Sequence, residues 1–164
     1  SEFFDGAFAV QVIHHVRHKE AFLREAYRVI RKRGSIAIDS CSHAQMRAHW
    51  FYHYFPRGLE IDLARIPDTG EIVSLLSRAG FVDMEVEACY SDLVVTHETP
   101  QSYLSTEYRS GISTFSFLNS AEIEAGCQKL RRDIRSGAAD KIVERSRNVM
   151  EGRLGGSSII HARK

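Results

Sequence analysis

Residues 4–40 read FDGAFAVQVIHHVRHKEAFLREAYRVIRKRGSIAIDS, and this stretch decides the fold class. The segment 3–13 is apolar almost throughout, which predicts a strand covered on both faces. In residues 19–32 apolar side chains recur at helical spacing, so we predict an amphipathic helix that Gly34 ends. The apolar run 35–39 predicts a second strand. A strand, a helix and a strand in this order are typical of a parallel α/β sheet.

The composition is that of an ordinary globular domain. The chain has 164 residues, of which 43% are hydrophobic and 26% charged, so we expect one domain with a substantial core. A net charge of +1 excludes a strong general attraction to nucleic acid or to an anionic membrane surface, and no apolar run is long enough to span a membrane. Three widely spaced cysteines match no metal-binding pattern, so we expect reduced thiols and a cytoplasmic protein.

The rest of the chain alternates helix signals with strand signals. Asp68, with Glu71 three residues on, predicts a capping box that opens a helix, and Gly80 ends that helix. Alternating apolar and acidic residues over 82–88 predict a strand with one face in contact with water. Thr99 and Pro100 predict the start of a helix that extends to about residue 110. Further helices are predicted over 120–136 and 139–151, and a closing strand over 157–163.

Two groups of residues resemble class I S-adenosylmethionine-dependent methyltransferases, most closely the small-molecule branch of quinone-biosynthesis type. In that family one strand begins with FD and ends with LHH, a helix of the form EAxLREAxRVLKPGG follows, and a later helix ends in LLxxAGF. The matching residues are Phe4-Asp5, Ile13-His14-His15, Glu20 to Ile30, Arg33-Gly34 and Ile72 to Phe81. The resemblance implies the C-terminal part of a Rossmann-like doubly wound α/β sheet with extra helices. The strand order would be 4-5-7-6 with the last strand antiparallel.

The family's cofactor fingerprint is a Gly-rich turn after the first strand and an acidic residue that ends the second strand, and this chain has no counterpart of it. We therefore expect a partial methyltransferase domain over residues 1–164, inactive alone, with S-adenosyl-L-methionine as the cofactor of the complete protein. The strand Phe4–Ile13 would then be an uncovered edge, so we expect it to pair with a missing N-terminal half or with a second copy of the chain. The expected segments are a core (1–42), a substrate cover (43–66), a helix and strand (67–96), a helical insertion (97–152) and a final strand (153–164).

By the same resemblance, the C-terminal end of the first strand borders the methionine end of the cofactor. Gln11, Val12 and His15 are therefore the expected cofactor-binding residues. Methyl transfer depends mainly on the placement of donor and acceptor, and a base is needed only when the acceptor must lose a proton. The expected catalytic candidates are His14, His15 and Asp39, in that order, since histidine titrates near neutral pH. The alternative is that His14 and His15 only cap a buried strand.

Residues 43–55, HAQMRAHWFYHYF, carry three histidines and five aromatic residues, and we predict one helix here that Pro56 and Gly58 break. We expect this helix to cover the substrate. His49 and His53 lie one turn apart and would permit a shared metal, but no third ligand is evident and no metal site is expected. The alternative is a packed amphipathic cap without a ligand. The substrate-binding candidates are His43, His49, Trp50, His53 and Tyr54.

The chain is thus predicted to be part of a methyltransferase that acts on an oxygen, nitrogen or carbon atom of a small molecule. Basic residues on the helices after residue 120 alternate with acidic ones, so neither nucleic acid nor a membrane is an expected partner. The first alternative is a non-catalytic α/β dimerisation or scaffold module derived from the same fold. A nucleotide-binding dehydrogenase is a weaker alternative, because it would also need the missing Gly-rich turn.

Overall fold

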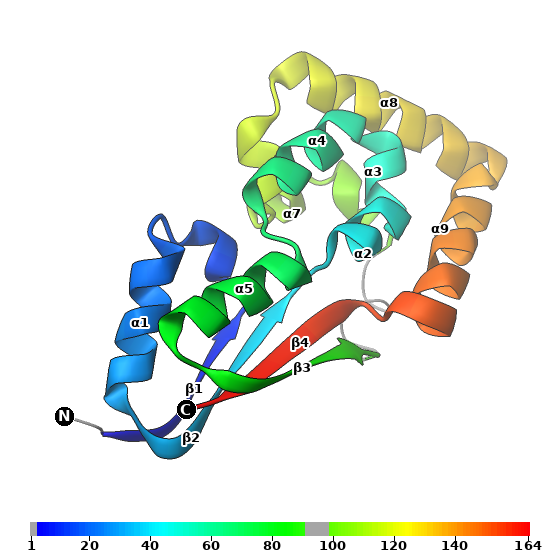
Figure 1. Cartoon of the computed structure of the whole chain (residues 1–164). Helices are drawn as coiled ribbons and strands as arrows, with labels where there is room; N and C mark the ends of the chain where they lie inside the picture. The colour runs from blue at the N-terminus through cyan, green and yellow to red at the C-terminus, as the bar shows by residue number, and fades with distance from the viewer. Residues whose placement is uncertain (1–2, 91–98) are drawn as a thin grey trace. The chain divides into compact units, whose positions relative to one another are not determined.

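The computed structural model describes residues 3–90 and 99–164 (Figure 1). Its contacts divide the chain into two compact units, and each is described by itself. Unit 1 comprises Ser1–His43, Ile66–Cys89 and Ser157–Lys164, and unit 2 comprises Ala44–Arg65 and Tyr90–Gly156. The chain therefore leaves unit 1 twice to build unit 2. Residues 91–96 of the predicted helix-and-strand segment, and residues 97–98 of the predicted insertion, lie outside the described residues.

Unit 1 is built on a four-stranded sheet with the order β1-β2-β4-β3. Its strands are β1 (Phe4–Val10), β2 (Ile30–Ser40), β3 (Val82–Cys89) and β4 (Ser157–Arg163). β1 and β2 are parallel, whereas β4 runs antiparallel to both β2 and β3. This arrangement confirms the predicted order 4-5-7-6 with an antiparallel last strand.

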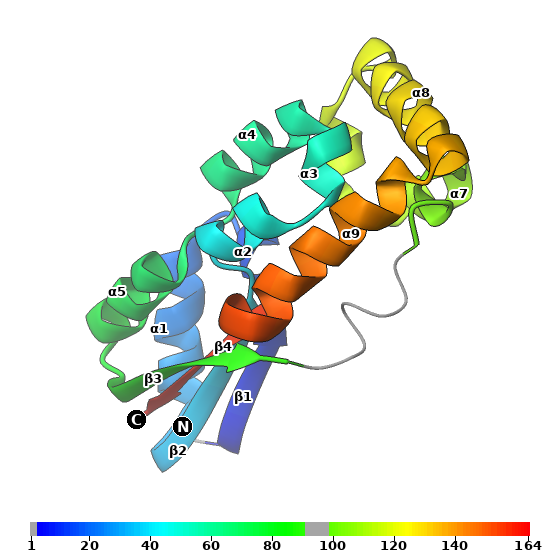
Figure 2. The same cartoon turned by 90° about the vertical axis from the view of Figure 1, so that its right-hand side faces the viewer.

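One face of the sheet is covered by two helices, α1 (Lys19–Val29) and α5 (Thr69–Ala79) (Figures 1 and 2). Leu23 of α1 and Leu76 of α5 are fully buried with Ile36, Ile38 and Ile160 of the strands. The apolar stripes predicted for both helices thus form one core with alternate residues of each inner strand.

The opposite face of the sheet is open in unit 1. Phe8 is 82% exposed and Val10 is 59% exposed, while Ala9 between them is buried. The prediction that this strand is covered on both faces is therefore wrong for the described residues. Among the described residues β1 also forms one edge of the sheet, since β2 is the only strand that pairs with it there. Apolar residues consequently meet solvent both on the face and along the edge of β1.

The turn after α1 differs from the prediction. The helix ends at Val29, and Arg33 (φ 68°) rather than Gly34 takes the left-handed conformation. Gly34 is required for a different reason, because a Cβ there would lie 2.5 Å from Ile30 Cγ2 and 2.6 Å from Asp5 O. The register between β1 and β2 shifts at this point, so the glycine permits a close approach of the two strands.

Two expectations for the segment 68–89 also need correction. Asp68 precedes α5, but its carboxylate makes no bond to the helix and instead accepts a hydrogen bond from His43 N at 2.8 Å, so no capping box forms. Gly80 ends the helix in the left-handed conformation (φ 105°), as predicted. β3 is present, yet Val82 and Val86 are both largely exposed because this strand forms the second edge of the sheet.

Unit 2 is helical and has an aromatic core. Phe51 lies at its centre, with ring-centroid separations of 5.1 Å to Phe55, 5.2 Å to Tyr103 and 5.5 Å to Phe115. Its longer helices are α4 (Pro56–Arg65), α8 (Ser120–Ser136) and α9 (Ala138–Val149). The shorter elements are α2 (His43–Ala48), which begins at the boundary with unit 1, α3 (Phe51–Tyr54), η2 (Ser102–Leu104), α7 (Thr106–Ser110), η3 (Ser113–Phe117) and a π-helical turn η4 (Met150–Leu154).

Some helix boundaries of unit 2 agree with those predicted from the sequence, and others differ. Asn119 and Glu122 form a capping box at the start of α8, and Gly137 (φ 75°) ends that helix as predicted. Pro56, in contrast, begins α4 rather than ending a helix, which suits a residue without an N–H group. Gly58 lies inside α4, where a Cβ would lie 2.9 Å from Thr114 Cγ2. The helix predicted from residue 99 to about 110 is divided into η2 and α7.

No helix within residues 3–90 and 99–164 has the length and apolar character needed to cross a membrane.

Candidate functional site

The C-terminal ends of β1 and β2 meet at one edge of the sheet in unit 1, because the two strands are parallel. Ligands of doubly wound sheets bind beyond such an edge. Gln11 Nε2 donates a hydrogen bond to Asp39 Oδ2 at 3.3 Å and lies 3.9 Å from Cys41 Sγ, and Gln11 N donates to Asp39 O at 3.0 Å. Two of the predicted site residues are thus in direct contact, although 28 positions separate them.

Gln11 has a left-handed backbone conformation, with φ of 49°. This conformation is uncommon for a residue with a side chain, and such residues concentrate at functional sites. It turns the chain out of β1 toward the one-turn 3₁₀ helix η1 (Ile13–His15). Gln11 is therefore held at the tip of the strand, where it contacts the end of β2.

Two buried polar atoms at this edge lack a hydrogen-bond partner among the described residues. They are Asp39 Oδ1 and Ser40 Oγ, at the end of β2. Ser40 is fully buried and pairs in register with the buried Ser158 of β4. Buried polar groups are satisfied in the great majority of cases, so unpartnered ones mark a place where a ligand or water belongs. Sequence reasoning missed Ser40 and Ser158, although the polar run that follows the apolar strand 36–38 is a signal for them.

The predicted histidine pair lies in η1. The rings of His14 and His15 are 4.1 Å apart between centroids and inclined at 45°. Ile13 is fully buried and anchors the turn, His14 is half-buried, and His15 and Val12 are exposed. The structure therefore places all the predicted cofactor-binding and catalytic residues on the segments that end β1 and β2.

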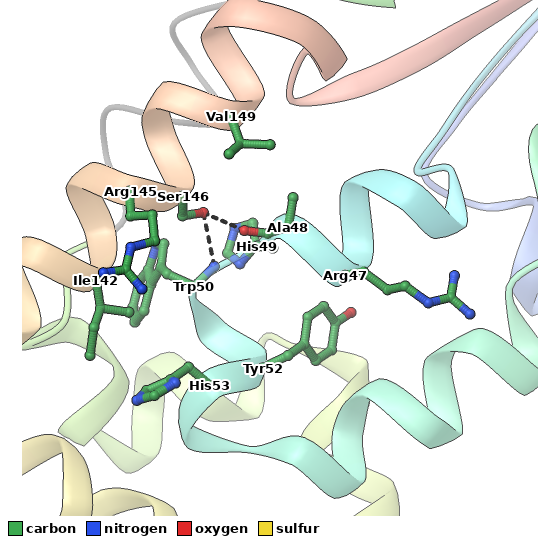
Figure 3. Close-up of a pocket in the computed structure, with 10 residues that line it drawn as sticks. All are labelled: Arg47, Ala48, His49, Trp50, Tyr52, His53, Ile142, Arg145, Ser146 and Val149. Carbon is green, nitrogen blue, oxygen red and sulfur yellow. Dashed lines mark hydrogen bonds between the residues drawn. The ribbon is translucent and has the colours of Figure 1, made fainter.

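The predicted substrate-binding residues divide into three groups. His43 belongs to unit 1, where its ring Nε2 lies 2.9 Å from Ile66 O. His49, Trp50 and His53 line a groove of about 450 Å³ in unit 2, which we call the tryptophan groove (Figure 3). Tyr54 lines a different pocket, of about 380 Å³, together with His53. The other residues of the tryptophan groove are Arg47, Ala48, Tyr52, Ile142, Arg145, Ser146 and Val149.

Ser146 of α9 fixes the wall of the tryptophan groove. Its hydroxyl donates to Ala48 O at 2.7 Å and accepts a hydrogen bond from Trp50 N at 3.0 Å (Figure 3). Trp50 N therefore does not bond to the preceding helical turn, and the predicted single helix 43–55 is divided into α2 and α3. The same two bonds tie the backbone at Ala48 and Trp50 to α9.

The histidines of this region are not arranged to share a metal. His49 Nδ1 accepts a hydrogen bond from Phe51 N at 3.2 Å, and His53 Nε2 contacts the ammonium group of Lys129. Burial and then the charge of Lys129 lower the pKa of His53 below its ordinary value of 6.5. Burial, together with the nearby charge of Asp133, raises the pKa of Tyr54 well above its ordinary range, so its phenol stays protonated. No cluster of three or more metal-binding side chains occurs among the described residues.

Comparison with known proteins adds independent findings. Residues 1–38 match a family model described as a methyltransferase domain, whereas a comparison with curated protein sequences gave no significant match. Among solved structures, a protein from Anabaena variabilis described as an antibiotic-biosynthesis methyltransferase is 26% identical, with a TM-score of 0.74. That alignment covers 98% of this chain and 67% of the Anabaena chain, so the chain spans about two thirds of that relative.

Two further solved structures are more distant. A SAM-dependent methyltransferase from Thermotoga maritima is 26% identical, with a TM-score of 0.42 over 55% of this chain and 44% of that chain. A phosphoethanolamine N-methyltransferase from Haemonchus contortus, solved with S-adenosylhomocysteine, is 16% identical, with a TM-score of 0.46 over 99% of this chain and 35% of that chain. Of the three, the Anabaena protein is the one whose similarity supports the fold. Together with the strand order β1-β2-β4-β3, these findings confirm the predicted resemblance: the chain has the α/β fold of the class I S-adenosylmethionine-dependent methyltransferases.

Proposed function

We propose that this chain is the C-terminal, acceptor-binding part of an S-adenosylmethionine-dependent methyltransferase that acts on a small molecule. The observation that carries the proposal is the polar edge where β1 and β2 end, with Gln11 bonded to Asp39 and a second carboxylate oxygen of Asp39 buried without a partner among the described residues. A buried carboxylate oxygen of this kind suits a cationic or N–H donor ligand. The edge therefore fits the methionine end of the cofactor.

The residues of this edge have distinct expected roles. The cofactor, when bound, supplies an activated methyl group for displacement by the acceptor. Gln11, Val12 and His15 would border its methionine end, and Asp39 would fix Gln11 through their hydrogen bond. If the acceptor must lose a proton, the imidazoles of His14 and His15 are the first candidates to take it at neutral pH, followed by the Asp39 carboxylate. The chain's main contribution is positioning.

The remaining cofactor contacts would come from a preceding segment with a Gly-rich turn. Such a segment would also pair with the free edge of β1 and cover the open face on which Phe8 and Val10 lie. The 67% coverage of the Anabaena relative is in keeping with a longer complete protein. The three widely spaced cysteines of the sequence, which match no disulfide framework, favour a cytoplasmic location.

Calorimetric titration with S-adenosylhomocysteine tests the proposal on two samples, the 164-residue chain and the complete product of its reading frame. The complete protein should bind at micromolar concentration, and the chain alone should bind weakly or not at all. Asp39→Asn should weaken binding to the complete protein, while Asp5→Asn, at the other end of β1 in an exposed ion pair with Arg31, should not. Absence of binding to the complete protein, or micromolar binding by the chain alone, would contradict the proposal.

The second candidate is a non-catalytic module that associates through the same surface. It is favoured by the coincidence of a free strand edge and an exposed apolar face in β1. Sedimentation velocity distinguishes the two: a module of this kind should form a discrete dimer that Val10→Lys dissociates. The methyltransferase proposal predicts that the complete protein binds the cofactor whatever its oligomeric state.

A further inference from the structure

We propose that the tryptophan groove of unit 2 binds a planar aromatic carboxylate, with Arg145 as the residue that recognises its charge. This inference goes beyond the proposed function, which concerns the polar edge of unit 1. It concerns a groove that is distinct from the polar edge of unit 1 and lies wholly within unit 2.

The first argument is the charge of the groove lining. Its lining residues include Arg47, Arg145, His49 and His53, and none of them is an aspartate or a glutamate. Burial is the largest cause of the lowered pKa of His53; the charges of Lys129 and Arg145 act in the same direction, and the charge of Asp133 opposes them. A groove of this charge attracts anions.

The second argument concerns Arg145 itself. Among residues 3–90 and 99–164 no carboxylate lies within ion-pair distance of Arg145, whereas Arg147, two positions along α9, pairs with Glu151 at 3.9 Å. Arg145, Trp50 and Ile142 line the same groove, and in Figure 3 the side chain of Arg47 extends away from the other labelled residues. Arg145 is therefore the cation placed to bond a ligand lying against the indole. Its guanidinium group can form a bidentate pair of hydrogen bonds with a carboxylate.

The third argument is the shape and chemistry of the walls. The buried Trp50, with Ile142 and Val149 on α9, gives an apolar wall, and His49 stacks on Trp50 at a centroid separation of 5.8 Å and an angle of 24°. The hydroxyl of Ser146 is engaged by Ala48 and Trp50, so it fixes the wall rather than the ligand. A volume of about 450 Å³ lies in the range of pockets that bind small molecules.

The chain offers a direct reporter, since Trp50 is its single tryptophan. We would follow its indole N–H signal by NMR while titrating the 164-residue chain with benzoate, 4-hydroxybenzoate and 2-naphthoate, each against its neutral carboxamide. At least one carboxylate should shift the signal saturably at millimolar concentration, and its amide should bind about tenfold more weakly, because the charge-assisted bonds to Arg145 are lost. Arg145→Gln should weaken the carboxylate by a similar factor, and Arg147→Gln on the same helix should not.

Equal binding of acids and amides, an unchanged affinity in Arg145→Gln, or no saturable shift with any of the three acids would overturn the inference. Arg145 and Arg147 are both exposed. An unchanged indole signal of the unliganded Arg145→Gln and Arg147→Gln variants confirms that the variants fold. The outcome is separable from that of the proposed function. Carboxylate binding without cofactor binding by the complete protein would refute the function alone, and cofactor binding without carboxylate recognition would refute this inference alone.

Discussion

Replacement of Asp62 by alanine should remove much of the stability of unit 2. Asp62 is 1% exposed, and its carboxylate accepts three hydrogen bonds: from Tyr52 Oη at 2.9 Å, Thr114 Oγ1 at 2.7 Å and Arg65 Nε at 2.6 Å. The Arg65 side chain is itself only 17% exposed. One buried group thus joins α3, α4 and η3.

The expected cost follows from what the substitution leaves behind. Loss of one partner of a buried ion pair costs about 3–5 kcal/mol, because the other charge stays buried without compensation. Each hydroxyl that loses its charged acceptor adds about 1 kcal/mol. A domain of this size has a total stability of about 5–15 kcal/mol, so Asp62→Ala should leave unit 2 marginally folded. With a slope of about 2 kcal/mol per molar urea, this combined cost of about 5–7 kcal/mol should lower the unfolding midpoint by about 2.5–3.5 M.

Urea unfolding followed by the fluorescence of Trp50, which lies in the same unit, measures this loss. The matched control is Glu60→Ala on the same helix, since Glu60 pairs with Arg57 at the surface and its loss should cost less than about 0.5 kcal/mol. If Asp62→Ala does not fold, Asp62→Asn, which keeps the shape and one oxygen acceptor, should show an intermediate loss. A cost below about 1 kcal/mol for Asp62→Ala, or equal costs at positions 60 and 62, would refute the reasoning.

Two further predictions concern packing and charge in unit 2. Gly126→Ala should destabilise the protein by about 1–3 kcal/mol, because the new Cβ would collide with the ring of Phe55. The control is Gly70→Ala, which should be neutral or stabilising because no atom lies within 4 Å of the new Cβ. Thermal unfolding of the two variants measures the difference. His53 should titrate below 6.5 in the folded chain, so its contribution to stability is present above the unfolded pKa and is lost as the pH falls below it. Lys129→Met should raise the His53 pKa in an NMR titration, and an unchanged value would contradict a contribution from the Lys129 charge.

Much of unit 1 could be predicted because its signals are local. The closing strand was predicted over 157–163 and observed as Ser157–Arg163, since the β-branched pair Ile159-Ile160 follows a turn signal at Gly155-Gly156. Gly80 could be predicted as the end of its helix, because helices commonly end at a residue in the left-handed conformation and glycine adopts it most easily. The family motifs then supplied the order of the strands, which periodicity alone does not give.

The failed predictions share a physical cause: a competing partner from a distant part of the chain. Asp68 does not cap its own helix, because its carboxylate bonds to His43 N, 25 positions away. The aromatic helix is interrupted because Trp50 N finds the hydroxyl of Ser146, 96 positions away. Local propensity cannot anticipate a hydrogen bond that exists only after the chain has folded.

The candidate site likewise combines features that the local sequence determines with features that only tertiary contacts determine. The residue types and spacing of 4–40 by themselves determined the strand–helix–strand unit, the family and the placement of Gln11 and Asp39 at strand ends, because hydrophobic period and turn residues are properties of neighbouring positions. Tertiary structure alone decided that Gln11 bonds to Asp39, that the His43 ring contacts Ile66 O, and that Arg145 and Trp50 line the same groove. These are contacts between segments far apart in the chain, and their geometry is fixed only when the strands pair and the helices pack.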